Sequence, residues 1–172
     1  MKHKTLYKTR KLLASAVAFA FFPMANAAET DIEWVNPDGY ADLGTDFHDE
    51  VTLEQFQGEL EPYIARIAER ALPDGYQLEI KFTNVDLAGE YEPWRLNNDV
   101  RIVRSVYPPK MSFEYKLFDS RGNLAKSGEE TIIDPTFDFN VGRRFFETDG
   151  FFYEKELIGS WIRNDLANSL DS

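Results

Sequence analysis

The stretch Asp86–Arg95, Asp-Leu-Ala-Gly-Glu-Tyr-Glu-Pro-Trp-Arg, has the highest density of side chains that can do chemistry. Three carboxylates stand close to a tryptophan and an arginine there. Paired carboxylates act as acid and base in glycoside hydrolysis, and an indole ring can stack on a sugar. Glu90 and Glu92 are near neighbours, however, and nothing in the sequence sets a second carboxylate opposite them. A structured loop, in which Asp86 caps backbone amides and Gly89 makes a turn, accounts for the same residues.

We therefore take this segment as the candidate functional surface without assigning a catalytic residue to it. A hydrolase or a metal-dependent enzyme that uses its carboxylates is the alternative to a binding role. The candidate residues are Asp86, Gly89, Glu90, Glu92, Trp94 and Arg95.

A second group of reactive side chains lies in an acidic stretch nearer the N-terminus. His48 is the one histidine of residues 28–172, and no Gly-x-Ser-x-Gly elbow accompanies it, which argues against a serine hydrolase. Aspartates recur every four residues here and offer the oxygen ligands that calcium prefers. The spacing does not match an EF-hand loop, so we expect no cofactor and no metal. The candidates for a metal site, if there is one, are Asp38, Asp42, Asp46 and His48.

Aromatic residues are concentrated in Phe137–Tyr153, with Arg143-Arg144 at the centre of the tract. An exposed cluster of aromatic and arginine side chains is typical of protein interfaces, so the tract could form a partner-binding flap. The alternative is that these rings complete the core under the C-terminal helix.

Alternation of polar and apolar residues predicts the strands. It is clearest in Tyr76–Phe82, which predicts a strand with one buried and one solvated face. The alternation slips near Asn84, so we expect a bulge or a sheet edge there. The other predicted strands are Asp31–Val35, Val100–Val106, Met111–Leu117 and Leu124–Ile133, with a hairpin turn at Asp119–Asn123 between the last two.

Apolar residues at helical spacing predict two helices. The first follows a capping box formed by Thr52 and Gln55 and continues to Ala71. Pro62 interrupts it, so we expect a kink or two short helices. The second helix covers about residues 151–167, and its predicted buried stripe consists of Phe151, Ile158, Trp161, Ile162 and Leu166.

The predicted element order is β-α-β-β-β-β-α. This order indicates an α+β fold, a two-layer sandwich in which two main helices cover a mostly antiparallel sheet of four to five strands. The first β-α-β step allows one parallel pair of strands through a right-handed crossover.

Residues 1–27 have the layout of a cleaved secretory signal peptide. Five lysines and arginines and no acid lie within Met1–Lys11, and the apolar run Leu12–Phe22 carries no charge. Ala25-Asn26-Ala27 then fits an Ala-x-Ala cleavage site. The apolar run is too short to span a bilayer, which needs roughly 20 residues. We therefore expect a periplasmic or secreted protein without a transmembrane segment after cleavage.

Residues 28–172 have the size of one domain. Removal of the leader lowers Lys+Arg from 19 to 14 against 30 Asp+Glu, which gives a net charge of −16. Such a surface repels phosphate backbones, so nucleic acid is not an expected partner. The chain has no cysteine, which excludes thiol nucleophiles and thiolate metal sites.

Several motifs outside the leader also form a recognisable set. The most specific is Asp86-Leu87-Ala88-Gly89 followed by Glu92-Pro93-Trp94. Shorter ones are Val35-Asn36-Pro37 with Asp42, Leu72-Pro73, Asp99-Val100-Arg101, Gly128-Glu129-Glu130, and Tyr153-Glu154-Lys155 with Trp161. Together they resemble a family of exported Gram-negative bacterial proteins, the domain of unknown function 3016. The resemblance implies an exported single domain and brings no activity with it.

The shortage of catalytic side chains favours a non-enzymatic binding or envelope-associated module over an enzyme. Its expected partner is a protein or a small-molecule ligand whose identity the sequence does not specify.

Overall fold

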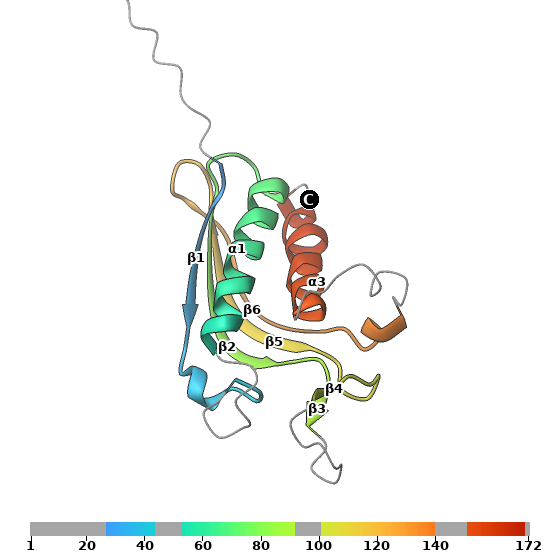
Figure 1. Cartoon of the computed structure of the whole chain (residues 1–172). Helices are drawn as coiled ribbons and strands as arrows, with labels where there is room; N and C mark the ends of the chain where they lie inside the picture. The colour runs from blue at the N-terminus through green and yellow to red at the C-terminus, as the bar shows by residue number, and fades with distance from the viewer. Residues whose placement is uncertain (1–26, 44–52, 92–100, 140–150, 171–172) are drawn as a thin grey trace, which may run out of the picture.

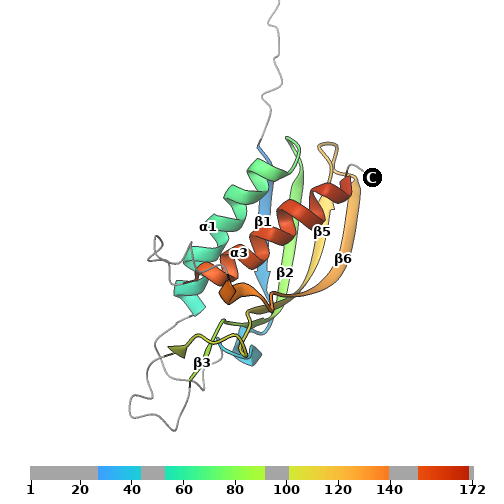
Figure 2. The same ribbon diagram turned by 90° about the vertical axis from the view of Figure 1, so that its right-hand side faces the viewer.

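The computed structural model describes residues 27–43, 53–91, 101–139 and 151–170. A sheet forms one layer, and two helices side by side on one of its faces form the other (Figures 1 and 2). The sheet has the order β1-β2-β5-β6, with β1 at Glu29–Trp34, β2 at Gln77–Asp86, β5 at Lys110–Phe118 and β6 at Leu124–Ile133. The helices are α1 (Leu53–Ala71) and α3 (Phe152–Ser160), and α3 continues into the π-helical η3 (Trp161–Leu166).

The sheet is mixed. β1 and β2 pair in parallel because α1 returns the chain to the end of the sheet where β1 began, whereas β2, β5 and β6 pair antiparallel. This arrangement confirms the predicted α+β sandwich, including the parallel pair that the first β-α-β step allowed. The shorter elements are η1 (Pro37–Gly39), β3 (Glu90–Tyr91), β4 (Arg101–Ile102), η2 (Phe137–Phe139) and η4 (Asn168–Leu170).

The core lies between the sheet and the helices. Every second residue of β2 faces the helices and is buried, while Glu79 and Lys81 between them face solvent. Burying one large apolar side chain completely stabilises a fold by about 1.5–3 kcal/mol. The fully buried core residues include Phe56, Leu60 and Ile64 of α1, Leu78, Ile80 and Phe82 of β2, and Met111, Phe113 and Leu117 of β5.

Aromatic contacts join the two layers. The indole of Trp34 stacks on Phe82 with ring centroids 4.6 Å apart. Trp161 meets Phe113 and Tyr115 edge-on at 4.7 and 5.0 Å. All five residues of the predicted C-terminal stripe are buried, which confirms that part of the sequence analysis.

The irregularity predicted near Asn84 is a β-bulge. In the pairing of β2 with β5 the register shifts between Phe82 and Asn84, so Thr83 is the extra residue. An extra residue changes the parity of the strand, which returns Val85 to the buried face. The hairpin turn at Asp119–Asn123 is also present, and β6 has the predicted bounds.

Of the two alternatives expected at Pro62, a kink or two short helices, the second is wrong. α1 is one helix of 19 residues with Pro62 inside it. Pro62 lies on the exposed side of the helix, where water can satisfy the carbonyl that loses its hydrogen bond. The buried residues on the opposite side of α1 keep the helix continuous past the missing hydrogen bond.

The predicted strand at Val100–Val106 is also wrong in extent and partner. Of its described residues, Arg101–Ile102 form β4, which pairs with β3 rather than with the main sheet. The chain then turns, and the amide of Tyr107 donates to the carbonyl of Arg104 at 2.9 Å. Apolar side chains follow β4 without entering the core, so the alternation there did not report burial: Val103 is 42% exposed.

The aromatic tract falls partly outside the described residues, which include Phe137–Phe139 and Phe151–Tyr153 but not residues 140–150 or Arg143-Arg144 within them. Phe137 and Phe151 are buried, as the core interpretation predicts for them. Phe139 is 76% exposed, which the core interpretation does not predict. Within the described parts of the chain, no helix has the length and apolar character needed to cross a membrane.

Candidate functional site

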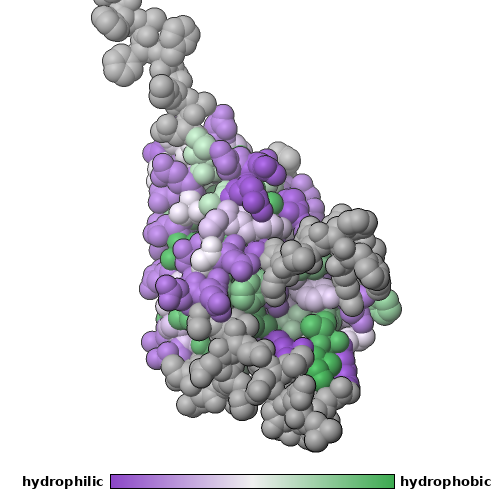
Figure 3. All heavy atoms as spheres, viewed as in Figure 1, coloured by the Kyte–Doolittle hydropathy of each residue, from purple (hydrophilic) through white to green (hydrophobic). Residues whose placement is uncertain are grey.

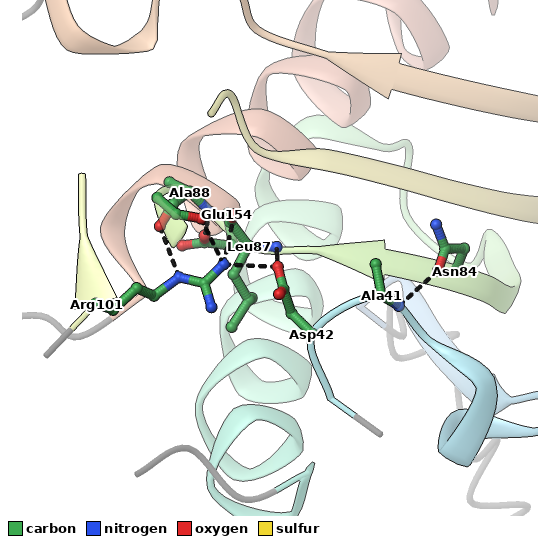
Figure 4. A network of polar contacts seen from close by, with 8 residues as sticks. Ala41, Asp42, Asn84, Leu87, Ala88, Arg101 and Glu154 are labelled. Atoms are coloured by element: carbon green, nitrogen blue, oxygen red, sulfur yellow. Dashed lines mark hydrogen bonds and ion pairs between the residues drawn. The ribbon is translucent and has the colours of Figure 1, made fainter. Parts of the chain in front are cut away.

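The loop that follows β1 lies along the end of β2 and places Asp42 beside the loop that follows β2. Tyr40 is buried, and its hydroxyl donates to the carbonyl of Phe82 at 2.6 Å. The amide of Ala41 donates to Oδ1 of Asn84 at 3.1 Å (Figure 4). These two contacts flank the extra residue of the bulge, so the bulge is part of the surface on which the loop docks.

Arg101 holds the loop that follows β2 by its backbone carbonyls. Its Nε donates to the carbonyl of Ala88 at 2.9 Å, and its Nη2 donates to those of Leu87 at 2.9 Å and Gly89 at 2.8 Å. Nη2 also lies 2.6 Å from Oδ2 of Asp42, and the same oxygen accepts the amide of Leu87 at 2.6 Å (Figure 4). Three successive carbonyls and one carboxylate therefore converge on a single guanidinium.

Glu154 completes the arrangement from the first turn of α3. Its side chain is buried, and Oε1 accepts the amide of Ala88 at 2.7 Å (Figure 4). The positive end of a helix dipole also favours a carboxylate at this position. The peptide groups around Ala88 are thus bound from both sides, by Arg101 through the carbonyl and by Glu154 through the amide. We call Asp42, Leu87, Ala88, Gly89, Arg101 and Glu154 the clamp.

The ion pair between Arg101 and Asp42 stabilises the clamp strongly because it is largely removed from water. The side chains of Arg101 and Asp42 are 14% and 12% exposed. Hydrogen bonds to charged groups contribute about 1.5–3 kcal/mol each. A buried charge that loses its partner is strongly destabilising. These residues therefore act as one unit that sets the position of the loop.

Two carboxyl groups at the clamp hold their protons more firmly than usual. Burial raises the pKa of Asp86 to about 6, with further contributions from a hydrogen bond to Asp42 and from its charge, while Arg101 and Lys110 act in the opposite direction. Burial also raises the pKa of Glu154, against the lowering effect of the Ala88 amide. Asp86 can therefore exchange a proton near neutral pH, which is a property of acid–base catalysts.

Gly89 allows β4 to approach the loop closely. Its φ is +90°, a conformation that residues with a Cβ rarely adopt. A Cβ built there would lie 2.8 Å from the carbonyl oxygen of Ile102. Glycine is therefore required both by the backbone and by the neighbouring strand.

The predicted site residues divide between the described and the undescribed parts of the chain. Asp86 and Gly89 lie at the clamp, and Glu90 begins the short strand β3. Glu92, Trp94 and Arg95 lie outside the described residues, as do Asp46 and His48. Of the metal candidates, Asp42 pairs with Arg101, and Asp38 lies in η1. Among the described residues, no group of three or more His, Cys, Asp or Glu side chains is placed to hold a metal ion.

Arg101 and Glu154 are clamp residues that are not among the candidate site residues predicted from the sequence. They are 59 and 66 residues away from the groups that they bind, Asp42 and Ala88, so no local pattern joins them. A signal was present in the motifs. Both residues belong to the short matches that carried the family resemblance.

Comparison with known families agrees with those motifs. Residues 28–164 match the family described as protein of unknown function (DUF3016). The chain belongs to this family. No curated protein and no solved structure matches the chain.

Four of the DUF3016 motifs quoted from the sequence meet at the clamp. Asp42, the segment Asp86–Gly89, Arg101 and Glu154 come from four separate matches, and they are bound to one another in the fold. The clamp therefore joins these four motifs of the DUF3016 chain into one structural unit.

Proposed function

We propose that the protein is exported and works in the periplasm, or outside the cell, as a non-enzymatic binding or envelope-associated module. Two boundaries support the export step. The DUF3016 match begins at Ala28, the first residue after the proposed cleavage site. The first strand begins one residue later, at Glu29. A leader that ends before the fold begins can be removed without disturbing the sheet.

Export is tested by fractionating Gram-negative cells that produce the whole chain and determining its N-terminus by mass spectrometry. The expected species begins at Ala28 and is found in the periplasm or the medium. A chain that retains Met1 and stays in the cytosol would contradict the proposal.

The binding role rests on the clamp, because its charged side chains are occupied by the protein's own backbone. Arg101 donates to three carbonyls and to Asp42, and Glu154 binds the amide of Ala88. Groups engaged in this way hold a surface in shape rather than act on a substrate. The clamp is therefore suited to presenting the loop after β2 in one fixed position.

Exposed apolar side chains beside the clamp suggest a protein partner. Val106 is 68% and Phe139 76% exposed. The hydroxyl of Ser105 donates to Asp138, which joins the segments that carry these two residues. The amide of Gly89 donates to the carbonyl of Tyr107 at 3.0 Å, which joins the segment of Val106 to the clamp. Figure 3 shows a mostly hydrophilic face, with hydrophobic residues gathered toward the end that carries β3 and β4. Apolar side chains of this kind are typical of interaction sites.

Site-specific photocrosslinking in producing cells tests this surface. A photoreactive amino acid at position 106 or 139 is expected to give a discrete crosslinked product. The same amino acid at Asp74, an exposed turn position at the other end of the sheet, is the matched control. Equal crosslinking from all three positions, or none from positions 106 and 139, would count against binding at the clamp end.

An acid–base enzyme is the second candidate, because one observation favours it. Asp86 combines partial burial with a pKa of about 6, which is close to the working range of a general acid or base. Asp86→Asn keeps the shape of the side chain and removes its titration. If the protein is an enzyme, this variant fails to rescue a deletion phenotype while remaining folded. Full rescue by Asp86→Asn would exclude a catalytic role for this carboxyl group.

A further inference from the structure

A groove of about 530 Å³ lies where the last turn of α1 meets the C-terminal helical segments. It is at the opposite end of the sandwich from β3, β4 and the clamp (Figures 1 and 2). Its volume lies within the range of roughly 300–1,000 Å³ that is typical of small-molecule sites. Its lining includes Ile67, Arg70, Ala71, Arg163, Ala167 and Leu170.

The charge of this groove is opposite to that of the chain. Its described lining includes two arginines, Arg70 and Arg163, and no aspartate or glutamate. The whole chain has 30 acidic residues against 19 basic ones. The remaining lining is mostly small or apolar, as a site for an aliphatic group requires. Two cations beside an apolar floor complement an amphipathic anion.

The helix ends explain part of this positive charge but not all of it. α1 and the C-terminal helix run in the same direction, so their C-terminal ends lie at the same end of the molecule (Figures 1 and 2). The C-terminal end of each helix carries roughly half a negative charge, and basic side chains are favoured there. Arg70 in the last turn of α1 and Arg163 in the last turn of η3 both fit that role. Two guanidinium groups nevertheless carry about twice the charge of two helix ends.

Arg163 has donors for a ligand. Its Nη2 lies 3.9 Å from Oε2 of Glu156, the long end of the range for an ion pair. A guanidinium has five N–H donors, so one distant carboxylate does not satisfy it. The guanidinium packs over Gly159, where a built Cβ would lie 3.0 Å from Nη1 of Arg163, so the lack of a side chain at position 159 lets Arg163 lie against the helix.

We propose that this groove binds an aliphatic carboxylate. The alkyl chain would lie on the floor formed by Ile67, Ala71 and Ala167, and the carboxylate would pair with Arg70 and Arg163. The inference goes beyond the proposed function, which concerns the clamp end, and names a second site with its own ligand class.

Calorimetric titration with decanoate below its micelle concentration tests the proposal. The expected result is saturable binding at one site. Arg70→Gln and Arg163→Gln are each expected to weaken it about tenfold, the usual scale for losing a charge-assisted contact. Arg121→Gln, in the exposed hairpin turn, is the matched control and is expected to bind like the wild type. Acetate lacks the chain and decyltrimethylammonium reverses the charge, so neither is expected to bind.

The proposal is overturned if decanoate binding does not saturate, if Arg70→Gln and Arg163→Gln both bind decanoate like the wild type, or if decyltrimethylammonium binds equally well. Should a variant fail to fold, amide chemical shifts of the wild-type protein decide the question. Decanoate is expected to shift resonances around Ile67 and Ala167 and to leave those around Gly89 unchanged. Failure of this test leaves the export and clamp experiments unaffected, because they probe the leader and the other end of the sheet.

Discussion

Nη2 of Arg101 lies 2.6 Å from Oδ2 of Asp42, although 59 residues separate the two in the chain. The pair ties the loop after β1 to β4, and the segment Leu87–Gly89 is bound between them. This contact and the one between Glu154 and Ala88 are the ones that fix the clamp.

Arg101→Gln is expected to lower the free energy of unfolding by about 3–5 kcal/mol, because it leaves a largely buried carboxylate at Asp42 without its partner. Urea unfolding measures the loss. Arg121→Gln removes an arginine from an exposed turn and is expected to stay within about 0.5 kcal/mol of the wild type. Equal losses in the two variants would show that the clamp does not stabilise the fold.

Asp86 is expected to make the protein less stable as the pH rises. Its pKa is raised from 3.8 to about 6, so between these values the folded state retains a proton that the unfolded state has lost. The free energy of unfolding therefore falls as the pH rises through this window and levels off above it. Glu154 adds a change of the same sign. Because Asp86 is partly solvated, we expect its share to be about 1–2 kcal/mol.

Urea unfolding between pH 5 and pH 8 checks this expectation. Asp86→Asn is expected to remove most of the pH dependence, whereas Asp165→Asn, in an exposed position, is expected to keep it. The pKa of Asp119 is lowered by its hydrogen bonds to Asn123 and acts in the opposite sense, but only near and below its ordinary value of 3.8. An unchanged slope in Asp86→Asn would show that another group is responsible.

Glu154→Ala is expected to cost about 1–3 kcal/mol more than Glu154→Gln. The alanine leaves the buried amide of Ala88 without its acceptor, whereas the glutamine keeps a side-chain oxygen for it. Glutamine also removes a buried carboxyl whose raised pKa opposes ionisation, so its cost is expected to shrink as the pH rises. Thermal unfolding of both variants at pH 5 and pH 8 makes the comparison. This account would be contradicted if the loss of stability caused by Glu154→Gln were the same at pH 5 and at pH 8.

Gly89→Ala is expected to be more destabilising than Gly122→Ala, although both glycines have positive φ. The loss of a favourable backbone conformation costs each variant about 1 kcal/mol. Gly122 has open space around it, whereas a Cβ at Gly89 meets the backbone of Ile102 at 2.8 Å. The difference between the two, measured by urea unfolding, isolates the close approach of β4. Equal costs would mean that β4 can move away without penalty.

The local elements of this protein could be predicted because they depend on short-range patterns. Alternation placed β2, β5 and β6, and the change of parity placed the bulge before Asn84. The same reasoning failed at Val103 and Val106, because alternation indicates a strand without showing whether a neighbouring strand is available. At Pro62 the alternative of two short helices is wrong, because the packing of the opposite face outweighs one missing hydrogen bond.

The sequence by itself determined the two-layer fold class, the segment Asp86–Gly89 as the unusual loop, and the family to which the chain belongs. Only the tertiary structure decided what that segment does. Asp42, Arg101 and Glu154 come from separate elements, and their spacing in the chain carries no information about their distance in space. Burial then gave these groups their energetic weight, because removal from water strengthens the ion pair and raises the pKa of Asp86 to about 6.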